Sequence, residues 1–422
     1  MGRVGPKKRL DRTQKFLGLP TILDLYSFLF LKRVKVTDSQ SQMSQVKTSC
    51  CGLGAFLAIL KNSNKENGYS TTKNIKLFSY EELKHATKDF HAGSRIGRGG
   101  FGTVYKGTLK NKTQVAVKLL SAESKQGIQE FLTEIDTITN VKHPNLVELI
   151  GCCVQGDNRI LVYEYVENRS LDRVLLGPTT NNLDWSKRSA ICIGTARGLA
   201  FLHEELDPHI VHRDIKASNI LLDRNFIPKI GDFGLAKLFP DDVSHLSTRV
   251  AGTTGYLAPE YAMRGQLTKK ADVYSFGVLI LEIVSGRNNA KSSWSGMPKV
   301  LLEWVWELYQ EGRLLELVDP QLQQYPEDQI LRFIKVALFC TQAAAKHRPS
   351  MTQVVAMLSK KSRLHEKQLT PPGIMQDLVG ITKSANYQQT PLVSSTKDSS
   401  AVSSSDPLLA DSPVNVNEMI PR

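Results

Sequence analysis

The feature that most constrains the fold of this chain is a set of three short motifs in its central part. Residues 212–219 read HRDIKASN, residues 232–234 read DFG, and residues 258–260 read APE. Any one of these strings can occur by chance. All three in this order and at this spacing indicate one catalytic region, built around a loop and the segment that follows it.

The residue types in these motifs match the needs of phosphoryl transfer from ATP. Asp214 is placed to orient an acceptor hydroxyl and take its proton. Asn219 and Asp232 offer oxygen ligands for two magnesium ions between the phosphates. Lys216 follows Asp214 by two residues and supplies positive charge beside the migrating group. We therefore expect ATP and Mg²⁺, or Mn²⁺, as cofactors.

A glycine-rich stretch upstream is expected to cover the ATP phosphates. Its G-x-G-x-x-G pattern is weak evidence alone, because dinucleotide-binding folds use the same string to open a helix. Here a strand over 103–107, a turn near Asn111 and a strand over 114–119 follow, which predicts a β-hairpin whose glycines let backbone amides approach phosphates. The residues expected at this site are Ile96, Gly97, Arg98, Gly99, Gly100, Phe101, Gly102 and Val104.

The second strand of the hairpin alternates, so Ala116 and Lys118 are expected on one face. Ala116 and Val104 would cover the adenine, while Lys118 would reach the α- and β-phosphates. A lysine in such a cleft needs an acidic partner.

The partner of Lys118 is expected on a helix predicted over 127–139. We favour Glu134, because Ile138 then lies one turn further on and can pack towards the catalytic loop. Glu130 is the rival, one turn before Glu134. Either carboxylate could instead form an exposed helix salt bridge, worth about 0.2–0.5 kcal/mol.

Residues 146–154 and 159–166 are predicted to form two further strands. The second would lead into a hinge between two lobes. Backbone groups near Glu164 and Val166 are expected to bind the adenine edge, with Tyr163 at the rear of the pocket. Further helices are predicted over 80–90, around 191–202, from 272 onwards, and near 301–311, 328–341 and 351–358.

With these residues laid out, the chain resembles the eukaryotic protein kinases over Phe90 to Ser359. It is most similar to the plant receptor-like and receptor-like cytoplasmic kinases, the Pelle/IRAK-like branch, and particularly to the cold-responsive protein kinases. The segments that carry the resemblance are FSYEELKHATKDF at 78–90, LSAESKQG at 120–127, IVHRDIKASNIL at 210–221, GTTGYLAPEY at 252–261, CTQ at 340–342 and RPSM at 348–351.

The resemblance implies an α+β, bilobal fold, with an antiparallel sheet and one helix in the N-lobe and a mainly helical C-lobe. It implies transfer to Ser or Thr, which Lys216 also favours over Tyr. Leu221 joins the ATP-binding residues, and Glu260 and Arg348 occupy the positions of a structural salt bridge. The implied roles are Asp214, Lys216 and Asn219 for catalysis, Lys118 and Glu134 as the ion pair, and Asn219 and Asp232 for the metal.

The expected domain organisation follows from the resemblance for the central region and from composition for the two ends. Residues 1–75 are a basic, largely disordered N-terminal region, 76–93 a pre-kinase helix, 94–360 the kinase domain, and 361–422 a disordered tail rich in Ser and Thr. Partners would be ATP, protein substrates and an upstream receptor kinase. Nucleic acid is not expected.

The N-terminal region suggests attachment to a membrane. The first fifty residues carry ten Lys or Arg and three Asp, a net +7 of the chain's total of +13. Such a basic end suits an anionic membrane surface, and acylation of Cys50 and Cys51 beside a short apolar run would strengthen the attachment. The alternatives are a solvated tail, a buried apolar segment, or import into the nucleus through residues 6–9, which read PKKR. We expect the cytoplasmic face of the plasma membrane or the cytoplasm, with adjacent cysteines that remain reduced.

Regulation is expected from the segment between the second and third motifs. Arg213 precedes Asp214 and would be a cation awaiting an anion, with Lys237 able to approach the same place. Thr248 is the expected main phosphosite and Ser247 the second. Thr253 is the third candidate phosphosite, although its hydroxyl is also expected to bond Asp214 and Lys216 directly. Thr248 could also be an ordinary solvated hydroxyl.

Two other function classes remain. A pseudokinase or scaffold would bind partners without catalysis, yet would keep every catalytic residue. A small-molecule kinase of the same fold would have little use for the complete motif at 258–260, which builds a peptide-docking shelf in protein kinases.

Overall fold

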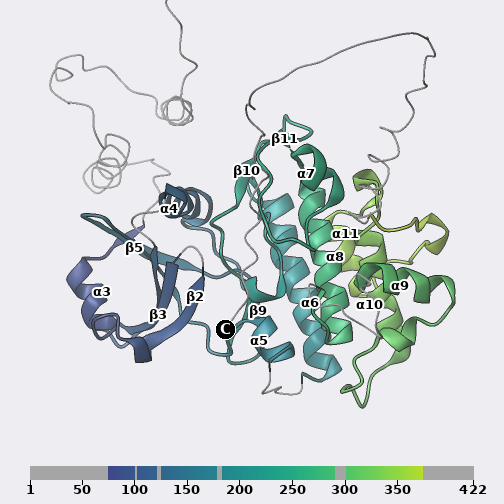
Figure 1. Cartoon of the computed structure of the whole chain (residues 1–422), viewed down its shortest axis with the longest axis horizontal. Helices are drawn as coiled ribbons and strands as arrows, with labels where there is room; N and C mark the ends of the chain where they lie inside the picture. The colour runs from purple at the N-terminus through teal and green to yellow at the C-terminus, as the bar shows by residue number, and fades with distance from the viewer. Residues whose placement is uncertain (1–74, 100–101, 121–124, 178–182, 290–300, 374–422) are drawn as a thin grey trace, which may run out of the picture. The chain divides into compact units, whose positions relative to one another are not determined.

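The computed structural model describes residues 75–99, 102–120, 125–177, 183–289 and 301–373, all within one compact unit. A sheet with two helices forms an N-terminal lobe, and helices dominate a C-terminal lobe (Figure 1). The predicted α+β, two-lobed architecture is confirmed. Residues 1–74 and 374–422, which include Cys50, Cys51, residues 6–9 and most of the tail, lie outside the described residues.

The N-lobe sheet has six strands in the order β1-β5-β6-β4-β3-β2. β1 pairs with β5 in parallel, and the other neighbours are antiparallel. The strands are β1 (Lys76–Leu77), β2 (Arg95–Gly99), β3 (Gly102–Thr108), β4 (Gln114–Leu120), β5 (Leu149–Gln155) and β6 (Asn158–Glu164).

The hairpin of β3 and β4 follows the alternation in the sequence. Val115 and Val117 are fully buried in a hydrophobic cluster with Phe78 and Leu83, while Ala116 and Lys118 lie on the other face, half-buried. Gly102, where β3 begins, needs the absence of a side chain, because a Cβ there would lie 2.3 Å from the Leu119 carbonyl oxygen. β2 and β3 therefore form the expected glycine-rich hairpin, although Gly100 and Phe101 are outside the described residues.

Helix α3 (Tyr80–Ala86) is shorter than the predicted helix over 80–90. Ser79 caps it by accepting a hydrogen bond from the Glu82 amide. Lys88, Asp89 and Phe90 all have positive φ angles, which are incompatible with continuing a right-handed helix. The left-handed turn instead directs the ring of Phe90 onto Tyr80 and Tyr105.

Helix α4 (Lys125–Ile138) packs against the inner side of the sheet, close to the predicted range. Phe131, Ile135 and Ile138 are buried on its apolar face.

The C-lobe is built on helices whose apolar stretches were predicted. α6 (Trp185–Ala200) starts at Asp184, which accepts a hydrogen bond from the Lys187 amide, and it continues into a π-helical turn over Phe201–Glu205. α8 (Lys269–Ser285) is capped by Thr268 and buried along most of its length. The remaining helices are α5 (Leu171–Leu175), α7 (Pro259–Arg264), α9 (Leu301–Gln310), α10 (Glu327–Cys340) and α11 (Met351–Leu358).

Three two-stranded sheets shape the catalytic region of the C-lobe. They pair β7 (His209–Val211) with β10 (Lys237–Phe239), β8 (Ile220–Leu222) with β9 (Pro228–Ile230), and β11 (Leu246–Ser247) with β12 (Gln266–Leu267). β7 precedes the catalytic loop in the sequence, and β8, β9 and β10 follow it. The third sheet holds the segment that carries the expected phosphosites.

Within the described ranges, Cys152, Cys153, Cys192 and Cys340 are buried and free. Burial raises the pKa of the Cys152 and Cys340 thiols to about 12, so both stay protonated at neutral pH. None of the helices in these ranges has the length and hydrophobicity that crossing a bilayer requires.

Candidate active site

The catalytic loop is held by hydrogen bonds to the buried carboxylate of Asp272 on α8. Its two oxygens accept hydrogen bonds from the backbone amides of His212 at 2.7 Å and Arg213 at 2.8 Å, and Nε2 of His203 lies 2.9 Å away. Burial on its own would raise the pKa of Asp272, but the hydrogen bond to His203 and the nearby imidazoles hold it below the usual value. An ionised carboxylate therefore fixes the loop to the most buried helix of the C-lobe.

Asp214 lies where three expected residues converge. Thr253 donates its hydroxyl to Oδ1 of Asp214 at 2.6 Å, and Nζ of Lys216 lies 2.8 Å from Oδ2. Lys216 also donates to the Thr253 hydroxyl at 2.7 Å. The predicted direct bonds of the Thr253 hydroxyl to Asp214 and Lys216 are therefore present.

Asn219 is oriented by the same aspartate. Its amide nitrogen donates to the backbone oxygen of Asp214 at 2.8 Å and to Oδ2 at 3.0 Å. With the nitrogen committed to Asp214, the amide oxygen is the atom left for a cation. The backbone oxygen of Asn219 accepts a hydrogen bond from the amide of Gly231. Because Gly231 is the residue before Asp232, this bond brings Asn219 close to Asp232.

Lys118 lies between two carboxylates from different parts of the chain. Its Nζ is 2.8 Å from Oε1 of Glu134 on α4 and 2.8 Å from Oδ1 of Asp232. Burial would lower the pKa of Lys118, but the two carboxylates raise it far above the usual value. Burial acts in the opposite sense on Asp232, and Lys118 holds its pKa below the usual range. Lys118 and Asp232 are therefore both charged at neutral pH.

Glu134 rather than Glu130 pairs with Lys118. Glu134 is fully buried and also accepts a hydrogen bond from the hydroxyl of Tyr163, at the rear of the cleft. Glu130 is 2% exposed and lies against Gly234, where a Cβ would come within 3.1 Å of Cγ of Glu130. Burial raises the pKa of Glu130 to about 7.

Apolar side chains join the two lobes behind this cluster. Ile138, Leu149 and Phe233 belong to one buried hydrophobic cluster, and the ring of Phe233 meets the imidazole of His212 edge-on at 4.8 Å. The packing expected from the position of Ile138 is thus present.

The oxygen atoms available as metal ligands near Asp232 fit a magnesium ion that is also bound by a nucleotide. No group of three His, Cys, Asp or Glu side chains able to hold a metal occurs within the described residues. Mg²⁺ keeps several waters and takes substrate phosphates together with only one or two protein carboxylates. The amide oxygen of Asn219 and the carboxylate of Asp232 suit that requirement.

The residues expected around adenine lie on five strands. Ile96 on β2 is half exposed, Val104 on β3 and Ala116 on β4 are half-buried, and Ala116 pairs with Tyr163 of β6. Leu221 on β8 is half-buried below them in the C-lobe. The two lobes thus each contribute an apolar wall.

The hinge follows Tyr163. The side chain of Glu164 points to Lys229, at 2.9 Å, and to the Glu148 amide, at 2.9 Å. Val166, two residues further on, is buried.

Arg213 is buried and held by neutral acceptors. Its guanidinium donates to the backbone oxygens of Leu235 at 2.9 Å and Arg249 at 2.8 Å, and to the hydroxyl of Tyr261. Thr248 precedes Arg249 and is half-buried, with its amide bonded to the Gly265 oxygen at 3.0 Å.

The other expected regulatory residues lie on two of the small sheets. Ser247 is exposed on β11, opposite Gln266. Lys237 pairs with Val211 in the sheet beside the catalytic loop.

The third motif is anchored by a buried arginine. Arg348 is 1% exposed and forms a two-pronged ion pair with Glu260, through Nη1 to Oε1 at 2.7 Å and Nη2 to Oε2 at 2.9 Å. The segment from Asp232 to Glu260 is therefore held at both ends.

Sequence reasoning assigned no role to three residues that the structure places in this machinery. Asp272 supports the catalytic loop, Tyr261 holds Arg213, and Glu282 accepts hydrogen bonds from the Tyr256 hydroxyl at 2.5 Å and the Asn289 amide at 2.7 Å. A carboxylate inside an apolar helix pattern was the available signal for Asp272 and Glu282, because such a group is rarely buried without hydrogen-bonded partners.

Comparison with known proteins gives a consistent picture. Residues 90–358 match the family model described as protein tyrosine and serine/threonine kinase. Over 313 residues the chain is 54% identical to cold-responsive protein kinase 1 of Arabidopsis thaliana. The matched part covers 73% of this chain and 80% of that protein.

Two probable LRR receptor-like serine/threonine-protein kinases of the same plant are also similar. One is 54% identical over 71% of this chain, and the other is 53% identical over 76% of it. The matched parts span only 29% and 32% of those two relatives.

Proposed function

The chain belongs to the protein tyrosine and serine/threonine kinase family and is a serine/threonine-protein kinase of the plant receptor-like type; we propose that it phosphorylates signalling proteins inside the cell, under the control of its own activation segment. The observation that carries this proposal is the position of Asp214. Its carboxylate contacts Lys216, Asn219 and the Thr253 hydroxyl within one hydrogen-bonded group.

The contact from Thr253 supports the assignment of Asp214 as the base. A hydroxyl that donates to Oδ1 at 2.6 Å has the geometry a substrate Ser or Thr would need when it gives up its proton. Lys216 lies within reach of both the carboxylate and that hydroxyl, so its charge can stabilise the negative charge that develops on the transferred group.

The phosphates of ATP would be held by the N-lobe. Lys118, fixed by Glu134, is the group for the α- and β-phosphates, and the hairpin of β2 and β3 would close over them. Asn219 and Asp232 would hold Mg²⁺ or Mn²⁺, which would neutralise phosphate charge. Most of the rate acceleration in this reaction class comes from such positioning and electrostatics.

A scaffold without catalysis is the second function considered. It receives no support from the site, because Lys118 pairs with both Glu134 and Asp232 and no expected catalytic group is displaced from the cleft.

The test of the function uses Asp214→Asn in the full chain. We expect ATP binding to change by less than about twofold, and transfer of labelled phosphate to myelin basic protein to fall by at least about a hundredfold. Asp157→Asn, in the exposed turn between β5 and β6, is the matched control and should keep full activity. Transfer by Asp214→Asn at the rate of the parent would refute the assignment of the base.

Control by phosphorylation is proposed at Thr248, with Ser247 second and Thr253 reserved for catalysis and substrate binding. Arg213 donates to the backbone oxygen of Arg249, next to Thr248, and to no carboxylate among its hydrogen-bond partners. A phosphate on Thr248 would carry about −1.5 to −2 charge and could replace those neutral acceptors with charge-assisted bonds.

We further propose that the basic residues before 75 hold the kinase at the inner face of the plasma membrane, with Cys50 and Cys51 as acylation sites. Each Lys or Arg near an anionic surface contributes about 1 kcal/mol, and two acyl chains make attachment stable. An upstream receptor kinase at the same surface is the proposed activator.

A further inference from the structure

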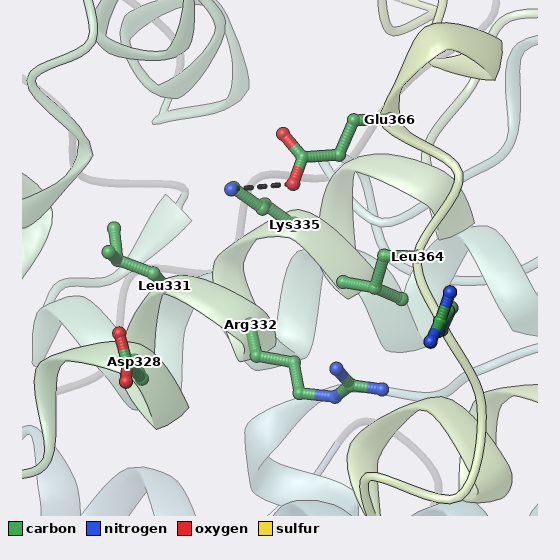
Figure 2. Close-up of a pocket in the computed structure, with 7 residues that line it drawn as sticks. Asp328, Leu331, Arg332, Lys335, Leu364 and Glu366 are labelled. Atoms are coloured by element: carbon green, nitrogen blue, oxygen red, sulfur yellow. Dashed lines mark hydrogen bonds and ion pairs between the residues drawn. The ribbon is translucent and has the colours of Figure 1, made fainter.

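The chain turns back along the C-lobe after α11 ends at Leu358. Figure 2 shows the start of this return, where Lys335 of α10 pairs with Glu366 at 2.7 Å. Arg332 of the same helix donates to the backbone oxygens of Met357 and Ser362. A pocket of about 360 Å³ lies between α10 and this segment and shares no residue with the active site. The returning segment is thus fixed to α10 before it reaches the base of the substrate shelf.

Residues 370–373, here named the C-terminal strap, then pair with the loop of residues 341–343. The Gly373 amide donates to the Thr341 oxygen at 3.1 Å, and the Ala343 amide donates to the Pro371 oxygen at 3.3 Å. Thr370 donates both its amide and its hydroxyl to Oε1 of Gln342, at 3.2 and 3.0 Å. The strap therefore acts as a short extra strand on the loop.

That loop supplies the acceptors that orient Arg348. Nε of Arg348 donates to the Gln342 oxygen at 2.8 Å, and Nη2 donates to the Ala343 oxygen at 3.2 Å. The remaining hydrogen bonds of the guanidinium include the two-pronged pair with Glu260. The position of Glu260 therefore depends on a loop whose other edge is covered by the strap.

A second path joins the strap to the same place. The Tyr274 hydroxyl donates to the Gly373 oxygen at 2.7 Å, and the guanidinium of Arg348 lies 5.0 Å from the centre of the Tyr274 ring. Gly373 also lies directly against Pro259, since a Cβ at Gly373 would be 2.8 Å from Cγ of Pro259. Pro259 and Glu260 open α7, at the end of the activation segment.

We propose that the C-terminal strap and Tyr274 are positioning elements for protein-substrate binding. They hold Pro259 and the Arg348–Glu260 pair, and through them the shelf on which the substrate protein lies. The inference rests on the proposed function, because it takes the shelf to bind a substrate protein. It assigns part of that binding to the strap, which lies beyond the family match at 90–358. The residues proposed for ATP binding belong to the N-lobe, the hinge and the catalytic region, and none of the strap's hydrogen bonds goes to them, so the strap should leave ATP binding unchanged.

The test compares full-length variants by steady-state kinetics with myelin basic protein and ATP varied separately. Gly373→Val places a side chain into Pro259 and Ala343, and Gly373→Ala is the milder version. Tyr274→Phe removes only the hydroxyl and keeps the ring beside Arg348. Lys367→Gln changes an exposed residue of the same returning segment and is the control.

We expect Gly373→Val to raise the KM for the protein substrate by about tenfold and Tyr274→Phe by about threefold, with the KM for ATP changed less than twofold. Lys367→Gln should match the parent. If the strap only stabilised the fold, the variants would instead have a lower melting temperature, and the KM for the protein substrate and the KM for ATP would change to the same extent. Equal KM values for the protein substrate in the parent and in soluble Tyr274→Phe and Gly373→Ala would overturn the proposal.

Hydrogen exchange gives a readout that does not need catalysis. The Ala262 amide donates to the Ala258 oxygen at 2.9 Å and the Gly265 amide to the Tyr261 oxygen at 2.9 Å, so both report on α7. We expect Tyr274→Phe and Gly373→Ala to speed exchange at these amides and not within β4. Unchanged exchange in α7 would refute the strap even if the parent had no kinase activity, whereas an inactive parent with faster exchange would count against the proposed function alone.

Discussion

The buried carboxyl of Glu130 should make the stability of the kinase depend on pH in a way that one substitution removes. Burial raises its pKa from 4.5 to about 7, although the charge of Lys118 acts in the opposite direction. In the unfolded chain the proton is released near pH 4.5. In the folded protein it is kept until about pH 7, so between these values the folded state binds more protons than the unfolded state.

The sign of the effect follows from that difference. Stability falls as the pH rises through the window from 4.5 to about 7, and the full penalty is present above it. A rise in pKa of this size corresponds to about 3.4 kcal/mol, which solvent screening of the carboxyl lowers to about 2 kcal/mol. Glu130→Gln keeps the shape of the side chain and cannot ionise. At pH 8 it should therefore be more stable than the parent by about 2 kcal/mol, which for a domain of this size is about 4 °C or more in melting temperature.

The assay is thermal unfolding of the full chain at pH 5 and pH 8, without nucleotide. The parent should lose stability relative to Glu130→Gln between the two pH values, while the two proteins should nearly coincide at pH 5. Glu81→Gln makes the same chemical change at an exposed position on α3 and should show no such difference. A constant difference between Glu130→Gln and the parent at both pH values would refute the reasoning, as would a variant that is less stable at pH 8.

The remaining predictions concern catalysis, switching and location. Lys118→Met should reduce phosphoryl transfer at least about a hundredfold and raise the KM for ATP, because Glu134 and Asp232 lose the cation between them; rates close to the parent's would contradict the clamp. Thr248→Ala should lower activity strongly while the exposed Ser244→Ala does not, and mass spectrometry of active enzyme should find phosphate on Thr248. Replacing Cys50 and Cys51 by Ser should reduce recovery of the protein with membranes on fractionation, whereas unchanged recovery, or a nuclear pool of the parent chain, would argue against the membrane proposal.

Local patterns predicted most of the N-lobe. Alternation along residues 115–118 put Lys118 on the cleft face, and the structure confirms that arrangement. The helix over 80–90 was wrong at its end, because a run of three positive φ angles after Thr87 stops it. Strand β1 was not predicted. Two residues carry no periodicity, and the strand exists only because Lys76 and Leu77 pair with β5, far along the chain.

The motifs also predicted the residues of the active site better than the residues that hold them in position. A catalytic carboxylate needs a lysine and an amide at fixed short spacings, so Lys216 and Asn219 could be placed from Asp214 alone. Asp272 and the C-terminal strap act across long stretches of sequence. Their roles depend on which backbone groups the fold brings within hydrogen-bonding distance, and no spacing rule contains that information.

Glu130 and Glu134 show where this limit lies. They are the same residue type, one turn apart on one helix, and both are buried. The helical pattern ranks them only through the apolar residues that accompany each. What separates them is tertiary: Glu134 meets Lys118 and Tyr163, whereas Glu130 faces Gly234, where the absence of a side chain makes room for it. The glycine of the DFG motif thus fits beside a carboxyl group held partly protonated near neutral pH, and the pH dependence predicted for Glu130 follows from packing that the sequence could suggest only as a rival ion pair.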